Sequence, residues 1–149
     1  MENVRSRREA VVREHMEAEN RLDFDAVIDT FAHPRYELIA TGQVHDGEEE
    51  VRDYFAATRS AFPDQRNELT ALHSTDDGIL VEFDLLGTHE GEFLGFAPTG
   101  RQFRCPMAAL YLFGEGEDRE KIVCERVWFD SLTILNQLGL VGGTADSGA

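Results

Sequence analysis

Two neighbouring segments of this chain are apolar on both faces, and this pattern constrains the fold more than any other feature. Residues 101–113 and 122–130 read as strands, and the acidic turn GEGEDRE separates them. One face of this predicted hairpin carries Phe103, Met107, Tyr111, Val123, Val127 and Phe129, and the other carries Pro106, Ala108, Leu110, Leu112, Ile122 and Trp128. Strands that are apolar on both sides are covered on both sides. We therefore expect helices against one face of a sheet and a second subunit against the other.

The remaining segments alternate between helical and strand patterns. Apolar residues at helical spacing predict helices over residues 3–20, directly after Asp23, over residues 48–62 and over residues 132–140. Strand patterns cover residues 36–41, 67–74 and 79–90. Asp23 and Ser131 are the predicted N-caps of the second and last helices.

This order of elements is typical of an α+β fold in which helices cover one side of a bent antiparallel sheet. A sheet of this kind encloses a cavity where the helices stand off it. The length of 149 residues favours one domain, residues 1–140. The Gly-rich tail, residues 141–149, is expected to be disordered.

Charge and composition exclude several classes of partner. The net charge is −15, from 29 acidic and 14 basic residues, so nucleic acid and anionic membranes are poor partners. No apolar run approaches the ~20 residues of a membrane span. The charged N-terminal segment is unlike a signal peptide, and we expect a cytoplasmic protein.

The two cysteines predict neither a disulfide nor a metal site. In the predicted hairpin, centred near Glu117, Cys105 lies opposite Phe129 and Cys124 opposite Leu110. The two sulfur atoms are then too far apart for a disulfide. No Cys/His spacing suggests zinc.

Asp130 is the first candidate for a catalytic side chain. It closes a predicted strand beside Trp128 and Phe129, and apolar surroundings raise the pKa of a carboxyl toward the range useful in proton transfer. Two structural interpretations compete with this one. Asp130 also suits the N-terminus of the last helix, and the predicted register places Arg104 opposite it.

The sequence pattern does not decide which face of the last predicted strand lines a cavity. Arg126 and Trp128 share a strand face with Asp130, so all three line the pocket if that face is concave. If it faces a second subunit, all three are structural. In the other register, Glu125 is the inward acid.

His89 is the second catalytic candidate. It continues the apolar face of the predicted strand 79–90, where it can act as a base or donate to a substrate carbonyl. A histidine bonded to backbone at a strand end is the structural alternative. His15 lies on the apolar stripe of the first helix, as a packing residue or a donor in the cavity wall. The other candidate pocket residues are Phe31, Tyr36, Tyr54, Phe55, Phe83 and Met107.

Several segments carry a family resemblance. The helical N-terminal part, AFPD after the third helix, GTHEGEFLGFAPTGR and WFDSLTILNQLGL resemble SnoaL-like polyketide (ester) cyclases of the nuclear transport factor 2-like superfamily. The similarity extends from Val11 to Leu140. It implies a cone-shaped, curved antiparallel sheet with N-terminal helices around an apolar pocket, and a homodimer.

The resemblance also implies a chemistry. Enzymes of this family close a ring by an intramolecular aldol step, with an aspartate as general acid/base and without metal or organic cofactor. The matching acid, at the end of the last strand, is Asp130. The cyclases also place a histidine on a neighbouring strand, whereas MAALYLF has none here and His89 is the nearest substitute. Because this superfold also hosts isomerases, hydrolases and binding domains, other functions stay open.

We therefore predict an enzyme for a small apolar or polyketide-like molecule that performs cofactor-free cyclisation, isomerisation or hydration. Asp130 transfers the proton, and His89 or a tyrosine such as Tyr36 polarises a carbonyl. The alternative is a non-catalytic ligand-binding or dimeric interaction domain, whose acid is paired with Arg104 or Arg126. A hydrolase that positions a water molecule is a third possibility.

Overall fold

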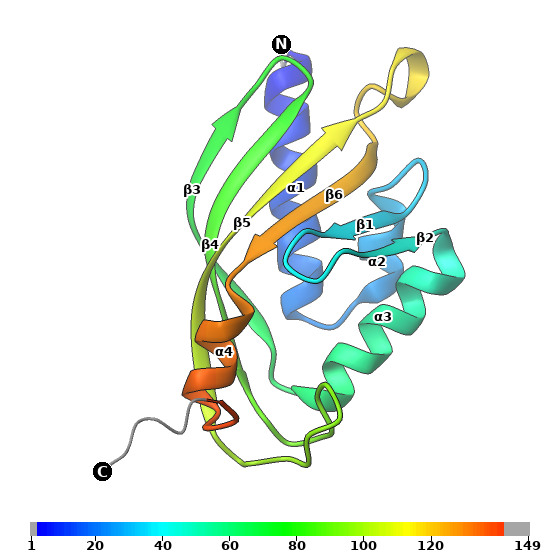
Figure 1. The fold of residues 1–149 in the computed structure, drawn as a ribbon. Helices are drawn as coiled ribbons and strands as arrows, with labels where there is room; N and C mark the ends of the chain where they lie inside the picture. The colour runs from blue at the N-terminus through cyan, green and yellow to red at the C-terminus, as the bar shows by residue number, and fades with distance from the viewer. Residues whose placement is uncertain (1–2, 142–149) are drawn as a thin grey trace.

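A curved, six-stranded sheet organises the protein in the computed structural model, which describes residues 3–141 (Figure 1). Across the sheet the strands are β2 (Gln43–Asp46), β1 (Arg35–Leu38), β6 (Ile122–Phe129), β5 (Gln102–Phe113), β4 (Gly78–Thr88) and β3 (Arg66–Ser74). The helices are α1 (Val4–Asn20), α2 (Phe24–Asp29), α3 (Glu48–Ala61) and α4 (Ser131–Gln137), with a short 3₁₀ turn, η1 (Gly116–Asp118). Figure 1 shows α1, α2 and α3 behind the sheet, so its opposite face is left largely open.

The sheet is mixed, whereas the sequence predicted an antiparallel one. Tyr36 pairs with Glu125 and Leu38 with Val127, so β1 runs parallel to β6. The predicted strand 36–41 ends early, because a turn with Gly42 at φ +75° returns the chain into β2. This strand, QVHD, is short and polar and was not predicted. As a result β6 is an interior strand, flanked by β1 and β5.

The hairpin of β5 and β6 pairs two residues away from the predicted register. Met107, not Cys105, lies opposite Phe129, and Leu112 lies opposite Cys124. The turn η1 and a bulge beside Phe113 cause this shift, and the bulge turns Ile122 rather than Val123 into the core. Both cysteines are free, as predicted.

Capping explains where three of the helices begin. Asn3 and Asp23 accept hydrogen bonds from backbone N–H groups in the first turns of α1 and α2, as expected for Asp23. The last helix begins one residue earlier than predicted, because Asp130 rather than Ser131 is its N-cap.

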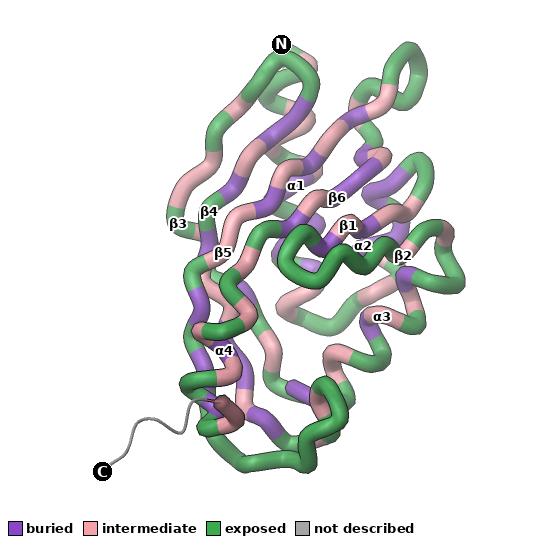
Figure 2. Tube along the Cα trace, in the orientation of Figure 1, coloured by how far each residue is buried: buried purple, intermediate pink, exposed green. Residues whose placement is uncertain are grey.

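The core lies between the concave face of the sheet and the helices. Figure 2 shows buried segments along β4, β5 and β6. The larger cluster joins α1, α2 and α3 to these strands through residues such as Val12, Val27, Phe55 and Val81. A smaller cluster packs α4 against the Gln102 end of β5, through Phe103, Cys105, Ile134 and Leu138.

No helix of the described residues combines the length and apolarity needed to cross a membrane. The predicted tail, residues 141–149, lies outside the described residues except for its first residue.

Candidate functional site

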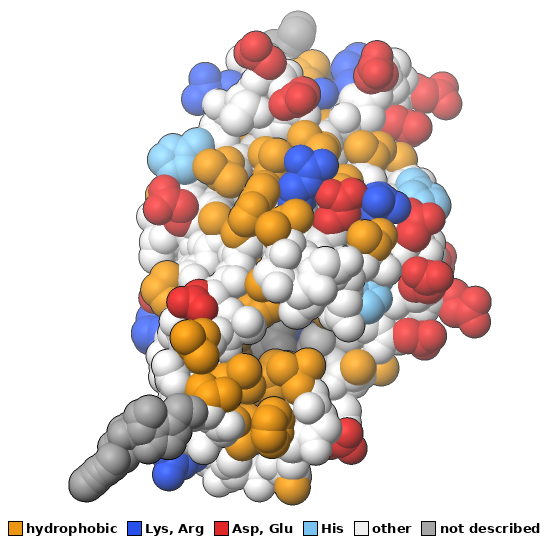
Figure 3. All heavy atoms as spheres, in the orientation of Figure 1, with side chains coloured by type: hydrophobic (Ala, Val, Ile, Leu, Met, Phe, Trp, Pro, Cys, Tyr) orange, Lys and Arg blue, Asp and Glu red, His pale blue; other side chains and the backbone are white. Residues whose placement is uncertain are grey.

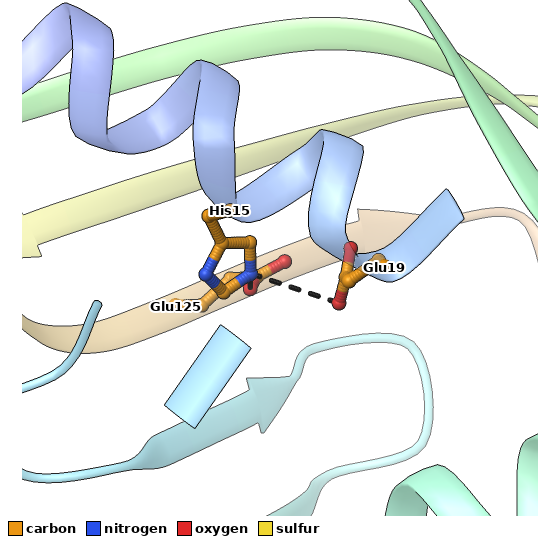
Figure 4. A group of neighbouring side chains, drawn as sticks. All are labelled: His15, Glu19 and Glu125. Carbon is orange, nitrogen blue, oxygen red and sulfur yellow. Dashed lines mark ion pairs between the residues drawn. The ribbon is translucent and has the colours of Figure 1, made fainter. Parts of the chain in front are cut away.

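Three titratable side chains meet beneath α1, at the centre of the concave face of the sheet. We call His15, Glu19 and Glu125 the acid–histidine cluster (Figure 4). His15 and Glu19 are four residues apart, so they project from one face of α1. Glu125 comes from the interior strand β6 and faces the same core as Val127. The topology thus places an acid from the end of the chain under the first helix.

The contacts of the cluster are short and buried. His15 Nε2 lies 2.9 Å from Glu125 Oε1 and 3.6 Å from Glu19 Oε2. The His15 side chain is 0% exposed and that of Glu125 is 6% exposed. Glu125 Oε1 accepts no well-aligned hydrogen bond despite the short distance to His15. This oxygen can therefore accept a proton or a hydrogen bond from a bound molecule.

Neighbouring hydroxyl groups fix the orientation of the imidazole. Thr30 Oγ1 donates to the carbonyl of Val27 at 2.6 Å, so it accepts a hydrogen bond from His15 Nδ1 at 2.9 Å. The other ring nitrogen then faces the two carboxylates. The Tyr36 hydroxyl donates to Glu19 at 3.0 Å and lies 3.2 Å from His15 Nε2. These contacts hold the ring in one orientation, with both nitrogens facing acceptors.

Burial and mutual charge shift the pKa values of the cluster. Burial alone would lower the pKa of His15, but Glu19 and Glu125 outweigh it and raise this pKa to about 10. Burial raises the pKa of Glu125, and repulsion by Glu19 adds to this effect. The pKa of Glu19 is lowered because His15 outweighs its burial. The cluster thus favours an imidazolium beside one firmly ionised carboxylate, Glu19, and one carboxylate that protonates readily, Glu125.

Tyrosine hydroxyls surround the cluster and stay protonated. Burial raises the pKa of Tyr36 and Tyr111 well above the usual value, and nearby carboxylates add to the effect. The ring of His15 contacts Phe31 and Tyr111 edge-on, with centroids 5.4 and 5.1 Å apart. These aromatic rings keep water away from the imidazole.

A small cavity opens beside Glu125. Its volume is about 50 Å³. It is lined by Met16, Glu19, Tyr36, Tyr54, Arg59, Gln65, Arg66, Asn67, Phe83, Leu85, Met107, Tyr111, Glu125 and Val127. A wider depression of about 830 Å³ lies between α1 and β3, but none of its titratable side chains is buried. The smaller cavity is the candidate site, because buried titratable groups with shifted pKa values line it.

The same three side chains are potential metal ligands, since their donor atoms lie within 4.8 Å of one another. Zn²⁺ bonds of 2.0–2.2 Å in a tetrahedral site hold ligand atoms roughly 3.4 Å apart. The 2.9 Å between His15 Nε2 and Glu125 Oε1 is instead a hydrogen-bond distance. The arrangement fits a direct ion pair between the two side chains better than a bridging cation.

We therefore expect dialysis against EDTA to leave the melting temperature and any turnover of the protein unchanged. A loss of turnover that one divalent cation restores would contradict this expectation. The measurement is turnover before and after dialysis, with metal content checked by mass spectrometry.

The predicted site residues divide into two groups. Tyr36, Tyr54, Phe83 and Met107 line the cavity, and His15, Phe31 and Phe55 belong to the buried shell around it. Arg126 and Trp128 do not line it, because their strand face points outward. Arg126 pairs with Glu37 at 2.7 Å, and Trp128 is 39% exposed.

Asp130 and His89 also lie outside the cavity. Asp130 is exposed and accepts hydrogen bonds from Leu132 N at 3.0 Å and Thr133 Oγ1 at 3.0 Å. It does not face Arg104, which pairs with Asp84 and Glu68. Asp130 therefore lies outside this cavity, because β6 ends one residue earlier than predicted and this residue caps α4. It lines a shallow depression on the open face of the sheet instead, and its catalytic role stays a prediction.

His89 is buried in the smaller core rather than in the cavity wall. Its Nδ1 accepts a hydrogen bond from Thr99 N at 3.2 Å, and its ring lies against Phe62 and Phe93. The sequence predicted that His89 points inward, but it follows the end of β4 and does not line the cavity. Glu19 was missed, although its spacing of four residues from His15 was a usable signal. Glu125 was considered only as the alternative acid.

Comparison with known proteins agrees with this fold. The family model for SnoaL-like polyketide cyclases matches residues 9–138. Aklanonic acid methyl ester cyclase AcmA from Streptomyces galilaeus is 32% identical over 133 residues, which cover 87% of this chain and 89% of that protein. A SnoaL-like protein from Jannaschia sp. CCS1 has a TM-score of 0.80 at 17% identity, covering 95% of this chain and 97% of that one.

An NTF2-like protein from Burkholderia thailandensis E264 has a TM-score of 0.73 at 21% identity, covering 93% of this chain and 98% of that one. These two likenesses confirm the predicted nuclear transport factor 2-like fold. The match over residues 9–138 and the 32% identity to AcmA confirm the resemblance seen in the sequence. The chain belongs to the SnoaL-like polyketide cyclase family.

Proposed function

We propose that the protein catalyses a cofactor-free proton-transfer reaction on a polyketide-like molecule, with Glu125 as general acid/base and His15 as its charged partner. The observation that carries the proposal is the buried contact of 2.9 Å between these two side chains, of which Glu125 also lines the cavity. A carboxyl with a raised pKa and a fixed partner is suited to take a proton from carbon near neutral pH.

The steps follow from the residues in the wall. Ionised Glu125 removes a proton from a carbon beside a substrate carbonyl. The imidazolium of His15 stabilises the negative charge of the resulting enolate. The enolate oxygen accepts a hydrogen bond from a protonated tyrosine such as Tyr111. The enolate carbon then forms a bond to a second carbonyl carbon, and Glu125 returns its proton to the resulting alkoxide. Protons balance over the cycle, and no redox partner is needed.

Substrate entry requires the cavity to widen. Pockets for small molecules measure about 300–1,000 Å³, and the cavity here is about 50 Å³. Gln65 and Arg66 belong to the less buried part of its lining. Movement of side chains on that side opens a path to Glu125 without disturbing the interior strand.

The family supports a polyketide-like substrate, and AcmA is named for the cyclisation of aklanonic acid methyl ester. We propose this ester as the first compound to test, by mass spectrometry and chromatography of the product. Turnover of it, or of a related methyl ester, supports an enzyme. Binding without turnover in a set of such esters would favour the non-catalytic binding domain instead.

The open face of the sheet supports a homodimer. Figure 3 shows hydrophobic side chains gathered over the strands of this face and over α4. Among its exposed apolar residues are Ile39, Val44 and Trp128. A second copy of the chain would cover this apolar face, because strands that are apolar on both sides are covered on both sides.

We expect light scattering after size-exclusion chromatography to give twice the 16.8 kDa of one chain at low micromolar concentration. Trp128→Glu should shift the mass to one chain, because a charge on this face opposes association. As a control, Glu49→Gln on the far side of α3 should leave the mass unchanged. A wild-type mass of one chain would contradict the dimer.

A further inference from the structure

Arg59, in the last turn of α3, is a cation without an ion pair at the cavity wall. Among the described residues, no carboxylate oxygen lies within 4.0 Å of its guanidinium, although the chain has 29 acidic residues. By contrast Arg35, Arg52, Arg104 and Arg126 each pair with a carboxylate. Four other arginines also lack an ion pair among the described residues, but only Arg59 of these five lines the cavity, where its charge is available for a ligand. The other four are Arg8, Arg13, Arg101 and Arg119.

The donors of Arg59 are also incompletely used. Its Nε is buried and has no hydrogen-bond partner, while Nη1 donates to Thr58 Oγ1 at 2.8 Å. A buried donor without a partner is costly, so its occurrence calls for an explanation. An acceptor that enters the cavity would satisfy it.

Two aromatic rings hold the guanidinium in place. Its central carbon lies 5.2 Å from the ring centroid of Phe24 and 5.9 Å from that of Phe55, and these rings stack at 4.7 Å. Cation–π contact restrains the side chain without using its N–H donors, of which Nε remains without a partner. The position is thus prepared before a ligand arrives.

The cavity has an acidic side and a basic side. Glu19 and Glu125 lie beneath α1, whereas Arg59 and Arg66 line the same cavity from the α3 side. A net charge of −15 repels anions in general, so a local cation is required if the ligand carries negative charge. Arg66 is exposed and lies 3.7 Å from Asp64, so it is partly neutralised.

We propose that Arg59 recognises an anionic oxygen of the substrate, either a carboxylate or an ionised phenol, while the reacting carbon lies toward Glu125. This inference rests on the proposed function, since it takes the cavity as the substrate site. The guanidinium presents several N–H donors in a plane that matches a carboxylate. Substrates with an acidic group are then preferred over neutral molecules of equal shape.

The alternative role for Arg59 is internal: it also contributes to the lowered pKa of Glu19. In that case removal of Arg59 would change the acid–histidine cluster but not the choice between charged and neutral ligands. A binding experiment with a matched pair of probes separates the two roles.

The probes are benzoate and benzamide, which have nearly the same shape and differ in charge. Titration calorimetry at pH 7 should show that the wild-type protein binds benzoate at least about tenfold more tightly than benzamide. Arg59→Gln should remove this preference without weakening benzamide, and Arg59→Lys should restore part of it because lysine keeps the charge but not the planar fork. Arg52→Gln is the control: Arg52 lies on the same helix but pairs with Asp25 and Glu48 outside the cavity, so this variant should keep the preference.

Three results would overturn the proposal: no binding of benzoate to the wild type, equal affinity for both probes, or a preference that persists in Arg59→Gln. Circular dichroism checks that the variants fold. If Arg59→Gln does not fold, the proposal is tested by the probe preference of the wild type and by the reduced preference expected for Arg59→Lys. Because the readout is binding without turnover, failure here is distinct from failure of the proposed catalysis by Glu125.

Discussion

Glu125→Gln is expected to reduce turnover by about 10²–10⁴-fold, the usual contribution of a general acid/base. The amide keeps the shape of the side chain but cannot take up or return a proton. Substrate affinity should change little, because the cavity wall keeps its volume. The measurement is kcat and KM for a methyl ester substrate of the polyketide type.

The matched control makes the same carboxylate-to-amide change at Asp130. Because Asn is about as good an N-cap as Asp, Asp130→Asn should keep both the stability of the protein and its turnover. The assignment of the proton transfer to Glu125 would be wrong if Asp130→Asn lost as much turnover as Glu125→Gln. This pair of variants therefore decides between the acid predicted from the strand end and the acid in the cavity.

His15→Gln is expected to lower the free energy of unfolding by about 3–5 kcal/mol near pH 6, the usual cost of removing one partner from a buried ion pair. The substitution leaves Glu19 and Glu125 together beneath α1 without a cation. The measurement is urea unfolding of both proteins. His73→Gln removes a histidine from an exposed pair with Glu82 and should cost less than about 1 kcal/mol.

The same pair of proteins gives a signed pH prediction. The pKa of His15 is raised from 6.5 to about 10 in the folded protein. Its contribution to stability is therefore fully present below pH 6.5 and is lost as pH rises toward 10. The difference in unfolding free energy between wild type and His15→Gln should shrink over that window. A difference that grew with pH would show that His15 is neutral in the folded protein.

The helices and the long strands could be predicted because local patterns determine them. α1, α3 and β4 follow helical or alternating apolar spacing, β5 is a long apolar run, and Asp23 caps α2 as its position indicated. β2 could not be predicted, since its four residues, three of them polar, form a strand only through pairing with β1. The parallel contact of β1 with β6 joins segments some 90 residues apart and leaves no local signal.

The candidate site was harder to predict because it depends on register. A shift of one residue in a strand exchanges its two faces, and the site residues of β6 depended on which face was concave. The aromatic wall, including Tyr36 and Tyr54, followed from composition and a cavity fold. The identity of the acid could not be predicted in the same way, because Asp130 and Glu125 are five residues apart and lie on opposite faces of the strand. Only the tertiary contact with His15 distinguishes them.

The central claim is that Glu125 exchanges a proton with carbon. The most direct test is hydrogen–deuterium exchange of aklanonic acid methyl ester in D₂O, followed by mass spectrometry, with the wild type and Glu125→Gln compared at equal concentration. The wild type should incorporate deuterium at a carbon beside a carbonyl, and the variant should do so no faster than buffer alone. Exchange at the wild-type rate in Glu125→Gln would contradict this claim.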